Sequence, residues 1–239
     1  MTMLSRFATL GGAPTDPYWA NVSYLLVGNG ANGTTTNIKD SSSNNLAVTI
    51  FGNTVISTTQ SKYGSGSVYF DGSGDYINIA GSSATNLTGV NFTIECWLYA
   101  ITIGTTVAYK IFNWDSPNDY LLEVTRLSNT TFSLGVYCGG VYIVSSSSSP
   151  ANCNQWNYIT FVRNGNTGIF FINGVLINSV AFAPTSTGSN SGTSIGMGNN
   201  YPGSYYLNGY IYDLRITKGV ARYTASFTPP TGPLPTTGP

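Results

Sequence analysis

The chain has no histidine and very little charge. Nine Lys and Arg and nine Asp and Glu among 239 residues give a formal net charge of zero at pH 7. Without histidine, a Ser-His-Asp triad and a His-ligated metal are both excluded. The scattered basic residues cannot form the stripe that phosphate neutralisation requires, so we expect no nucleic-acid partner. No apolar run approaches the roughly 20 residues that cross a bilayer, so we also expect no membrane insertion.

Two further features are missing. The start, MTMLSRFATLGG, carries one Arg and only a short apolar stretch, too short for the hydrophobic part of a secretory signal, so we expect synthesis in the cytosol. No window shows helical periodicity for longer than one turn. The fold class is therefore predicted to be all-β.

Cysteine is scarce, with three residues in all. Cys96 lies in FTIECWLY, where it alternates with apolar residues, which is typical of a small core side chain. Cys138 and Cys153 bracket a Ser-rich excursion whose two ends could meet. They could form a disulfide, or they could remain two thiols, which a reducing compartment favours.

Glycine, tyrosine, serine, threonine and asparagine dominate what is present, which indicates short strands and many tight turns. A chain of this length is an ordinary size for one β-sandwich domain, whose core needs neither a metal nor a disulfide. The near-neutral polar surface offers little colloidal repulsion. That suits a protein packed against other proteins, although a secreted soluble domain would fit it as well.

The clearest strand pattern is WNYITFVRNGNTGIFFINGVLI, from Trp156 to Ile177. It predicts three strands joined at Asn164-Gly165 and Asn173-Gly174, because Asn-Gly is the strongest short hairpin signal. In the first strand both faces carry apolar bulk. We therefore expect this antiparallel meander to lie inside a sandwich, with a second sheet or a loop over each side.

The remaining segments alternate in the same way. A hairpin is predicted over Ser67 to Ile79, turning at Asp71-Gly72-Ser73-Gly74. In the last strand, Leu207 to Thr217, strict alternation places Tyr210, Tyr212, Leu214 and Ile216 on one face and Ile211, Asp213 and Arg215 on the other. Further strands are expected at Val22 to Val27, Leu46 to Phe51, Phe92 to Ala100, Val107 to Asn113, Tyr120 to Arg126, Thr131 to Tyr137, Val141 to Val144 and Thr193 to Met197.

About fourteen strands with frequent turn signals favour a two-sheet antiparallel jelly-roll sandwich. We divide the chain into an extended N-terminal arm at residues 1–20, the sandwich at residues 21–227 and a Pro-rich C-terminal tail at residues 228–239. The tail, TPPTGPLPTTGP, is expected to be extended or disordered.

Several strings together resemble one known family: DPYWANVSYLL, SKYGSGSVYFDGSGDYINI, FTIECWLY, the meander and LNGYIYDLRITKGVARYTASFTPPT. They are similar to the laminin G-like branch of the concanavalin A-like lectin/glucanase superfamily, and the resemblance covers about residues 16–230. The pieces SKYGSGSVYFDGSGDYI and DLRITKGVARYTASFTPP are most similar to versions found in structural proteins of tailed bacteriophages. The resemblance implies a sandwich fold, but this fold carries lectins, glycosidases and inert scaffolds alike.

The resemblance also implies a metal site. Family members often hold a structural calcium ion between the N-terminal loop and the last strand, and the matching positions here are Asp40 and Asp213. Backbone carbonyls would complete the oxygen shell. Alternatively, Asp213 and Arg215 pair with each other. We expect no other cofactor.

The acidic residues do not predict catalysis. A glycosidase needs two carboxylates that converge on one sugar bond. The set that comes nearest to this is Asp115, Asp119 and Glu123. A solvated strand edge without catalytic function explains these residues better. Glu95 stands alone and is expected to be a hydrogen-bonded structural carboxylate. Sugar rings stack on exposed aromatic faces, and the candidates for such contacts are Trp114, Tyr142, Tyr201, Tyr205 and Tyr206.

These observations lead to three hypotheses. The first is a non-enzymatic decoration protein on the virion surface, assembled in the host cytoplasm. It would contact major capsid or tail proteins as a homo-oligomer, for example a trimer. The second is a tail-fibre or receptor-binding module that recognises a host surface glycan. The third, a glycosidase, has the least support in the sequence.

Overall fold

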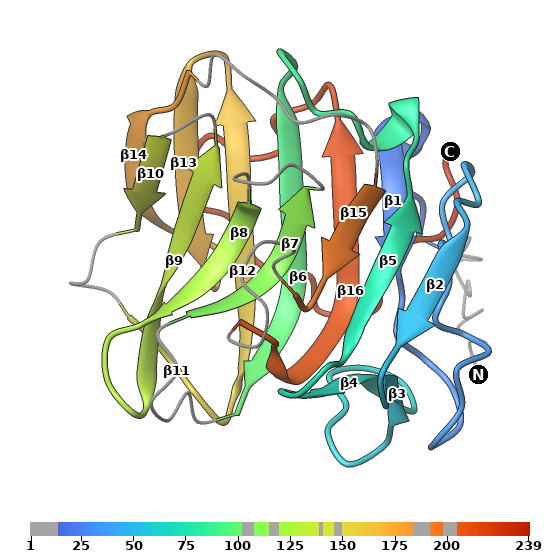
Figure 1. The fold of residues 1–239 in the computed structure, drawn as a ribbon. Helices are drawn as coiled ribbons and strands as arrows, with labels where there is room; N and C mark the ends of the chain where they lie inside the picture. The colour runs from blue at the N-terminus through green and yellow to red at the C-terminus, as the bar shows by residue number, and fades with distance from the viewer. Residues whose placement is uncertain are drawn as a thin grey trace, which may run out of the picture.

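The computed structural model describes residues 14–101, 108–114, 120–138, 141–145, 150–183, 192–197 and 205–239. The fold is all-β, and two antiparallel eight-stranded sheets pack face to face as a sandwich (Figure 1). The described helices are two single 3-10 turns, η1 (Trp19–Asn21) and η2 (Ser83–Thr85). None of the described helices has the length and apolar character required to span a bilayer.

The first sheet, sheet A, has the strand order β14-β13-β12-β6-β16-β4-β3, and β1 pairs with β16 beside this path. It contains the predicted meander as β12, β13 and β14, which confirms that prediction. The strands of sheet A are β1 (Val22–Leu26), β3 (Val55–Ser57), β4 (Ser67–Asp71), β6 (Phe92–Ala100), β12 (Trp156–Asn164), β13 (Thr167–Ile172), β14 (Val175–Ala181) and β16 (Asn208–Lys218).

The second sheet, sheet B, has the order β10-β9-β8-β7-β15-β5-β2, and β11 pairs with β9. Figure 1 looks onto sheet B, with sheet A behind it. Its strands are β2 (Val48–Phe51), β5 (Tyr76–Ala80), β7 (Ala108–Trp114), β8 (Tyr120–Arg126), β9 (Thr131–Cys138), β10 (Val141–Val144), β11 (Ala151–Asn152) and β15 (Gly192–Ile195).

The main core lies between the two sheets. Its strands contribute alternate residues to it, as the period of two in a strand requires, except where a bulge shifts the register. On β6 these residues include Ile94, Cys96 and Leu98, and on β12 they include Ile159 and Phe161. Cys96 is completely buried, which confirms its prediction as a small core side chain.

A second layer covers the outer face of sheet A. Phe227 packs on Tyr158 and Phe171, with ring centroids 6.2 and 5.3 Å apart, so the C-terminal segment supplies the cover that the apolar meander requires. Leu234 is buried beside Leu25 of β1. The tail at residues 228–239 therefore packs against the sandwich, and the disordered alternative does not hold.

The predicted hairpin at Ser67 to Ile79 is wrong. Its two strands form, but β4 pairs with β3 and β16 in sheet A, whereas β5 pairs with β2 and β15 in sheet B. The Gly-rich turn thus carries the chain from one sheet to the other. The carboxylate of Asp75 holds this crossover, because it accepts hydrogen bonds from the backbone N–H groups of Asn53 and Asp71.

Strict alternation in the last strand is also wrong. Tyr210 and Tyr212 point outward, but the register of β16 shifts after Tyr212, and Leu214 then joins the core. Asp213 lies in the shifted part, with a φ of 54°. A β-bulge of this kind adds one residue and reverses the faces that follow it.

The disulfide alternative fails because of strand topology. Cys138 lies at the end of β9, where β10 begins to pair, whereas the backbone N–H of Cys153 bonds to the carbonyl of Thr130 at the opposite end of β9. Eight residues of extended strand separate these ends by roughly 25 Å, far beyond the reach of a disulfide. Both cysteines are buried thiols.

Candidate functional site

A buried ion pair lies at the centre of the outer face of sheet B. Lys110 of β7 and Glu123 of β8 are directly opposite in the strand register, and their side chains form a salt bridge. Their neighbours Ile111 and Leu122 point into the core. Only 5% of Lys110 and 2% of Glu123 is exposed, so the charges are removed from water and depend on each other.

Two tyrosines complete this cluster. The hydroxyl of Tyr142, on β10, donates a 2.8 Å hydrogen bond to Oε1 of Glu123, which also accepts from the Thr125 hydroxyl at 3.0 Å. The ring centre of Tyr205 lies 5.0 Å from Nζ of Lys110, within the range of a cation–π contact. Lys110, Glu123, Tyr142 and Tyr205 are called the sheet-B cluster below.

Electrostatics keep the Tyr142 hydroxyl protonated. Burial and the negative charge of Glu123 raise the pKa of Tyr142 to about 12. Burial lowers the pKa of Lys110, and the neighbouring Glu123 opposes that shift. The cluster thus presents the neutral hydroxyl of Tyr142 beside the Lys110–Glu123 pair, whose opposite charges cancel.

A second aromatic group lies on the same sheet. Phe51 of β2 stacks on Tyr76 of β5 with ring centroids 4.2 Å apart, and the ring of Tyr206 lies 6.5 Å from that of Tyr76. Phe51 is 38% exposed. Since Tyr205 and Tyr206 are consecutive, they link this group to the sheet-B cluster.

The structure therefore brings together three of the five predicted aromatic contacts, Tyr142, Tyr205 and Tyr206. Tyr201 and the side chain of Trp114 lie outside the described residues, as do Asp115 and Asp119. Glu123 is a partner of Lys110 rather than a solvated acid. The sequence analysis missed Lys110, although its position between core residues in the pattern AYKIF was a signal that it faces outward.

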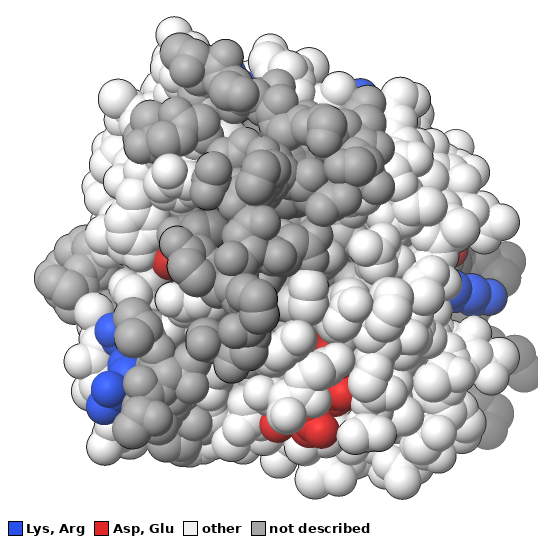
Figure 2. Space-filling model, viewed as in Figure 1, with Lys and Arg blue, Asp and Glu red and all other residues white. Residues whose placement is uncertain are grey.

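Charged groups are sparse on this side of the molecule. Figure 2, drawn from the same viewpoint as Figure 1, shows blue and red atoms in small separate groups among the white atoms of the described residues. Among the residues that the strands of sheet B contribute, Glu123 is the one acidic residue. The described part of this face is therefore suited to an uncharged partner.

The two predicted calcium ligands have other partners. Oδ1 of Asp40 accepts from the backbone N–H groups of Leu25 and Ser42, and Oδ2 accepts from Leu46. Oδ2 of Asp213 accepts from the N–H of Leu234 at 2.7 Å. In the described ranges, no three His, Cys, Asp or Glu residues lie together. The calcium site at Asp40 and Asp213, which backbone carbonyls would complete, stays a prediction.

The carboxylate of Glu95 belongs to a buried network, as expected. Arg215 donates to Glu95 and Asp16, and Arg222 donates to Asp16. The Tyr158 hydroxyl also donates to Glu95, at 2.7 Å. Arg215 thus makes its ion pairs with Asp16 and Glu95, so the alternative that it pairs with Asp213 does not hold. The network ties the segments that carry Asp16 and Arg222 to sheet A.

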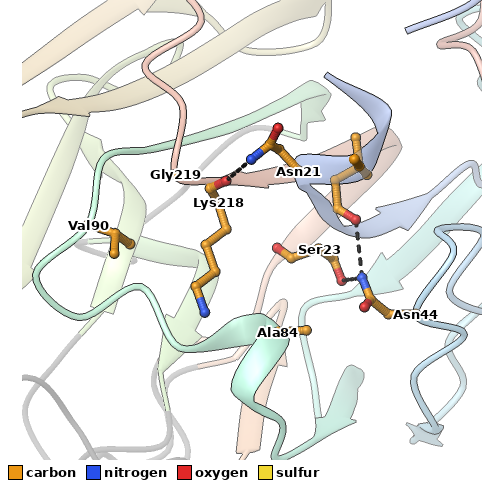
Figure 3. Close-up of a pocket in the computed structure, with 9 residues that line it drawn as sticks. Asn21, Ser23, Asn44, Ala84, Val90, Lys218 and Gly219 are labelled. Carbon is orange, nitrogen blue, oxygen red and sulfur yellow. Dashed lines mark hydrogen bonds between the residues drawn. The ribbon is translucent and has the colours of Figure 1, made fainter. Parts of the chain in front are cut away.

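A hollow of about 340 Å³ lies where β1, β16 and η2 meet (Figure 3). Its polar side chains are committed to the backbone: Asn21 donates to the carbonyl of Lys218, Asn44 to that of Val22, and Lys218 Nζ to that of Ser83. These bonds join chain segments to one another, which is a structural role. The hollow is lined by Ala20, Asn21, Val22, Ser23, Asn44, Ala84, Val90, Lys218 and Gly219.

Comparisons with known proteins agree with this architecture. Residues 71–222 match the family model described as the concanavalin A-like lectin/glucanases superfamily. Among curated proteins, none matches the chain. Solved structures with the same fold include toxin binding domains and a domain of a glycoside hydrolase.

The binding domain of Paraclostridial Mosquitocidal Protein 1 is 17% identical with a TM-score of 0.63, covering 85% of this chain and 50% of that one. Domain 4 of AbnA, a GH43 extracellular arabinanase from Geobacillus stearothermophilus, in complex with arabinotriose, is 18% identical with a TM-score of 0.60, covering 83% and 93%. The botulinum neurotoxin serotype D binding domain is 16% identical with a TM-score of 0.59, covering 84% and 49%. The chain thus spans about half the length of both toxin domains, and at these identities the likeness concerns the fold alone.

Proposed function

The chain belongs to the concanavalin A-like lectin/glucanase superfamily, and from that premise we propose that it is a non-catalytic, lectin-like module that binds carbohydrate on the outer face of sheet B. The observation that carries the proposal is the sheet-B cluster. In this cluster the half-exposed Tyr142 and the ring of Tyr205 lie on either side of the Lys110–Glu123 salt bridge. Sugar recognition commonly combines aromatic faces with a few placed polar groups.

The state of Glu123 supports binding rather than hydrolysis. Its Oε2 is engaged by Lys110, and its Oε1 accepts from Tyr142 and Thr125. A nucleophilic carboxylate needs a free oxygen. Neither oxygen of Glu123 is free while these contacts persist.

The shared fold is consistent with this role. One solved relative is described in complex with arabinotriose, and others are described as binding domains. Whichever sugar this chain takes, we propose that it is neutral, because the charges in the sheet-B cluster compensate each other.

A glycan array followed by titration of the best oligosaccharide tests the proposal. We expect Tyr142→Ala to weaken binding at least tenfold, since it removes an exposed ring and a hydroxyl donor. Val175→Ala is the control, because Val175 is 56% exposed on β14 of the other sheet. Absence of any bound glycan, or equal affinity of Tyr142→Ala and the parent protein, would contradict the proposal. Turnover that disappears in Glu123→Gln would favour an enzyme instead.

We also propose a setting for this module, the surface of a tailed-bacteriophage particle, where it would contact capsid or tail proteins as a homo-oligomer such as a trimer. The support is the resemblance of residues 61–77 and 213–230 to phage structural proteins, together with the nearly uncharged surface. Electron microscopy of particles with and without this protein tests the setting. We expect extra density on the particle surface, and identical particles would refute it.

A further inference from the structure

An aromatic row crosses the outer face of sheet A. It consists of Tyr69 on β4, Tyr210 on β16, Tyr99 on β6 and Trp156 on β12. Tyr210 is directly opposite both Tyr69 and Tyr99 in the strand register, and Tyr99 is directly opposite Trp156. These four residues, called the sheet-A row below, therefore run perpendicular to four adjacent strands.

The rings of this row touch one another. The centroid distances are 4.9 Å for Tyr69 and Tyr210, 5.7 Å for Tyr210 and Tyr99, and 5.7 Å for Tyr99 and Trp156. Tilted and edge-to-face pairs at these distances are mutually stabilising. The row is thus a rigid surface formed in advance, which lowers the entropy that binding would cost.

The C-terminal segment covers the neighbouring part of sheet A. The next outward residues along the strands, Trp97, Tyr158 and Tyr212, form a buried cluster with Phe227 packed against it. Lys62 closes that cluster on another side, with its Nζ 3.7 Å from the Trp97 ring centre. The sheet-A row lies beyond this cover, and Tyr69, Tyr99 and Trp156 remain half-buried.

Polar groups of the row remain unused. The hydroxyls of Tyr69 and Tyr99 and the indole N–H of Trp156 form none of the hydrogen bonds that the described residues make with one another, and none of these three atoms is fully buried. The row itself contains no charge. An uncharged partner rich in hydroxyl groups and with apolar C–H faces is complementary to such a surface.

We propose that the sheet-A row is a second carbohydrate-binding surface, which takes an extended, neutral polysaccharide chain across the strands. Sugar units of such a chain would meet Tyr69, Tyr99 and Trp156, whereas Tyr210, which is 7% exposed, supports the rings on either side of it. The proposal shares its ligand class with the proposed function, but it uses the opposite sheet. The molecule could therefore cross-link two glycan segments or bind one polymer with higher avidity.

Retention on insoluble cellulose, chitin and xylan tests the inference. We expect the full chain to bind at least one of them, and Tyr99→Ala to weaken that binding at least tenfold. Val175→Ala, at a 56% exposed position on β14, is the control and should bind as the parent protein does. Tyr142→Ala is measured beside it to separate this surface from the sheet-B cluster. Thermal unfolding of each variant identifies any loss due to misfolding. In that event a Tyr69→Phe and Tyr99→Phe double variant, which keeps both rings and removes two hydroxyls, should bind at least threefold more weakly.

The outcomes separate the two surfaces. If Tyr142→Ala abolishes retention while Tyr99→Ala does not, the inference is wrong and the proposed function stands. Loss with Tyr99→Ala alone supports the sheet-A row as the site for these polymers. If the full chain is retained on none of the three polymers, the inference is overturned. It is also overturned if the double variant folds normally and binds as tightly as the parent protein.

Discussion

At the residue scale, Asp213 combines several features that sequence alone does not suggest. It lies in the bulge of β16 with a positive φ, it is completely buried, and its Oδ1 has no hydrogen-bond partner in the described chain. Burial raises its pKa from 3.8 to about 7, although the Leu234 N–H and the charge of Arg215 oppose that shift. The folded protein therefore favours the protonated acid.

This gives a pH prediction. The pKa of Asp213 is higher in the folded protein than in the unfolded chain. The protonated carboxyl group therefore adds to the free energy of unfolding. This contribution is fully present below pH 3.8 and is lost as pH rises to about 7. A shift of about three units corresponds to at most about 4 kcal/mol. Asp213→Asn removes the titratable carboxyl group but keeps a side-chain oxygen that can accept from the Leu234 N–H. Asn also tolerates the positive φ.

Denaturant unfolding of both proteins at pH 4, 5.5, 7 and 8 checks it. We expect the variant to gain in stability relative to the parent protein between pH 4 and 7, and the difference to level off above that range. Two curves that stay parallel throughout would show that Asp213 does not titrate there.

At the element scale, the two turns of the meander look equivalent in sequence but differ in structure. In the first, the two central residues are Gly165 and Asn166, because Asn164 still pairs with Thr167. In the second they are Asn173 and Gly174, both with positive φ, as a type I′ turn requires. Only the second turn is crossed by the C-terminal segment, whose Phe227 N–H bonds to the Gly174 carbonyl.

The two glycines should therefore respond differently to alanine. A Cβ at Gly174 would overlap the Phe227 carbonyl oxygen, whereas a Cβ at Gly165 would meet nothing within 4 Å. Both substitutions strain a positive φ, at about 1 to 2 kcal/mol. Gly174→Ala should lose about 1 to 3 kcal/mol more, since the segment must shift. Urea unfolding of the two variants measures this, and equal losses would mean that the segment yields without cost.

At the scale of the whole molecule, the sandwich is closed by the two ends of the described chain. Asp16 accepts from Arg215 and Arg222, and its N–H bonds to the Thr237 carbonyl. Leu234 fills the small cluster beside β1. As a result, most of the outer face of sheet A is sealed, and the sheet-A row is the aromatic part that stays half-open.

Truncation of the tail side chain tests this closure. Leu234 is 6% exposed, and Leu234→Ala should cost about 2 to 5 kcal/mol through lost burial and the cavity left behind. Val175→Ala, at an exposed edge of the same sheet, should change stability by about 0.5 kcal/mol or less. Thermal and denaturant unfolding provide the measurement. Similar small effects for both variants would show that the tail does not stabilise the sandwich.

The sequence by itself determined the local features. Alternation predicted β6 and β8 to their exact limits, because a period of two follows directly from strand geometry. It also identified the meander, the core position of Cys96 and the all-β class. It did not place the sugar-contact candidates relative to one another: Tyr142 lies on β10, whereas Tyr205 and Tyr206 precede β16 and reach sheet B through Lys110 and Tyr76.

Only the tertiary structure decided which sheet each strand joins and what covers its faces. The sequence does not show that Gly72 turns the chain into another sheet, since a turn of similar composition can also close a hairpin. Nor does it show that Lys110 meets Glu123, or that Asp16 reaches Arg215 across 199 positions. Such contacts depend on register, and one bulge at Asp213 was enough to reverse the faces of every residue after it.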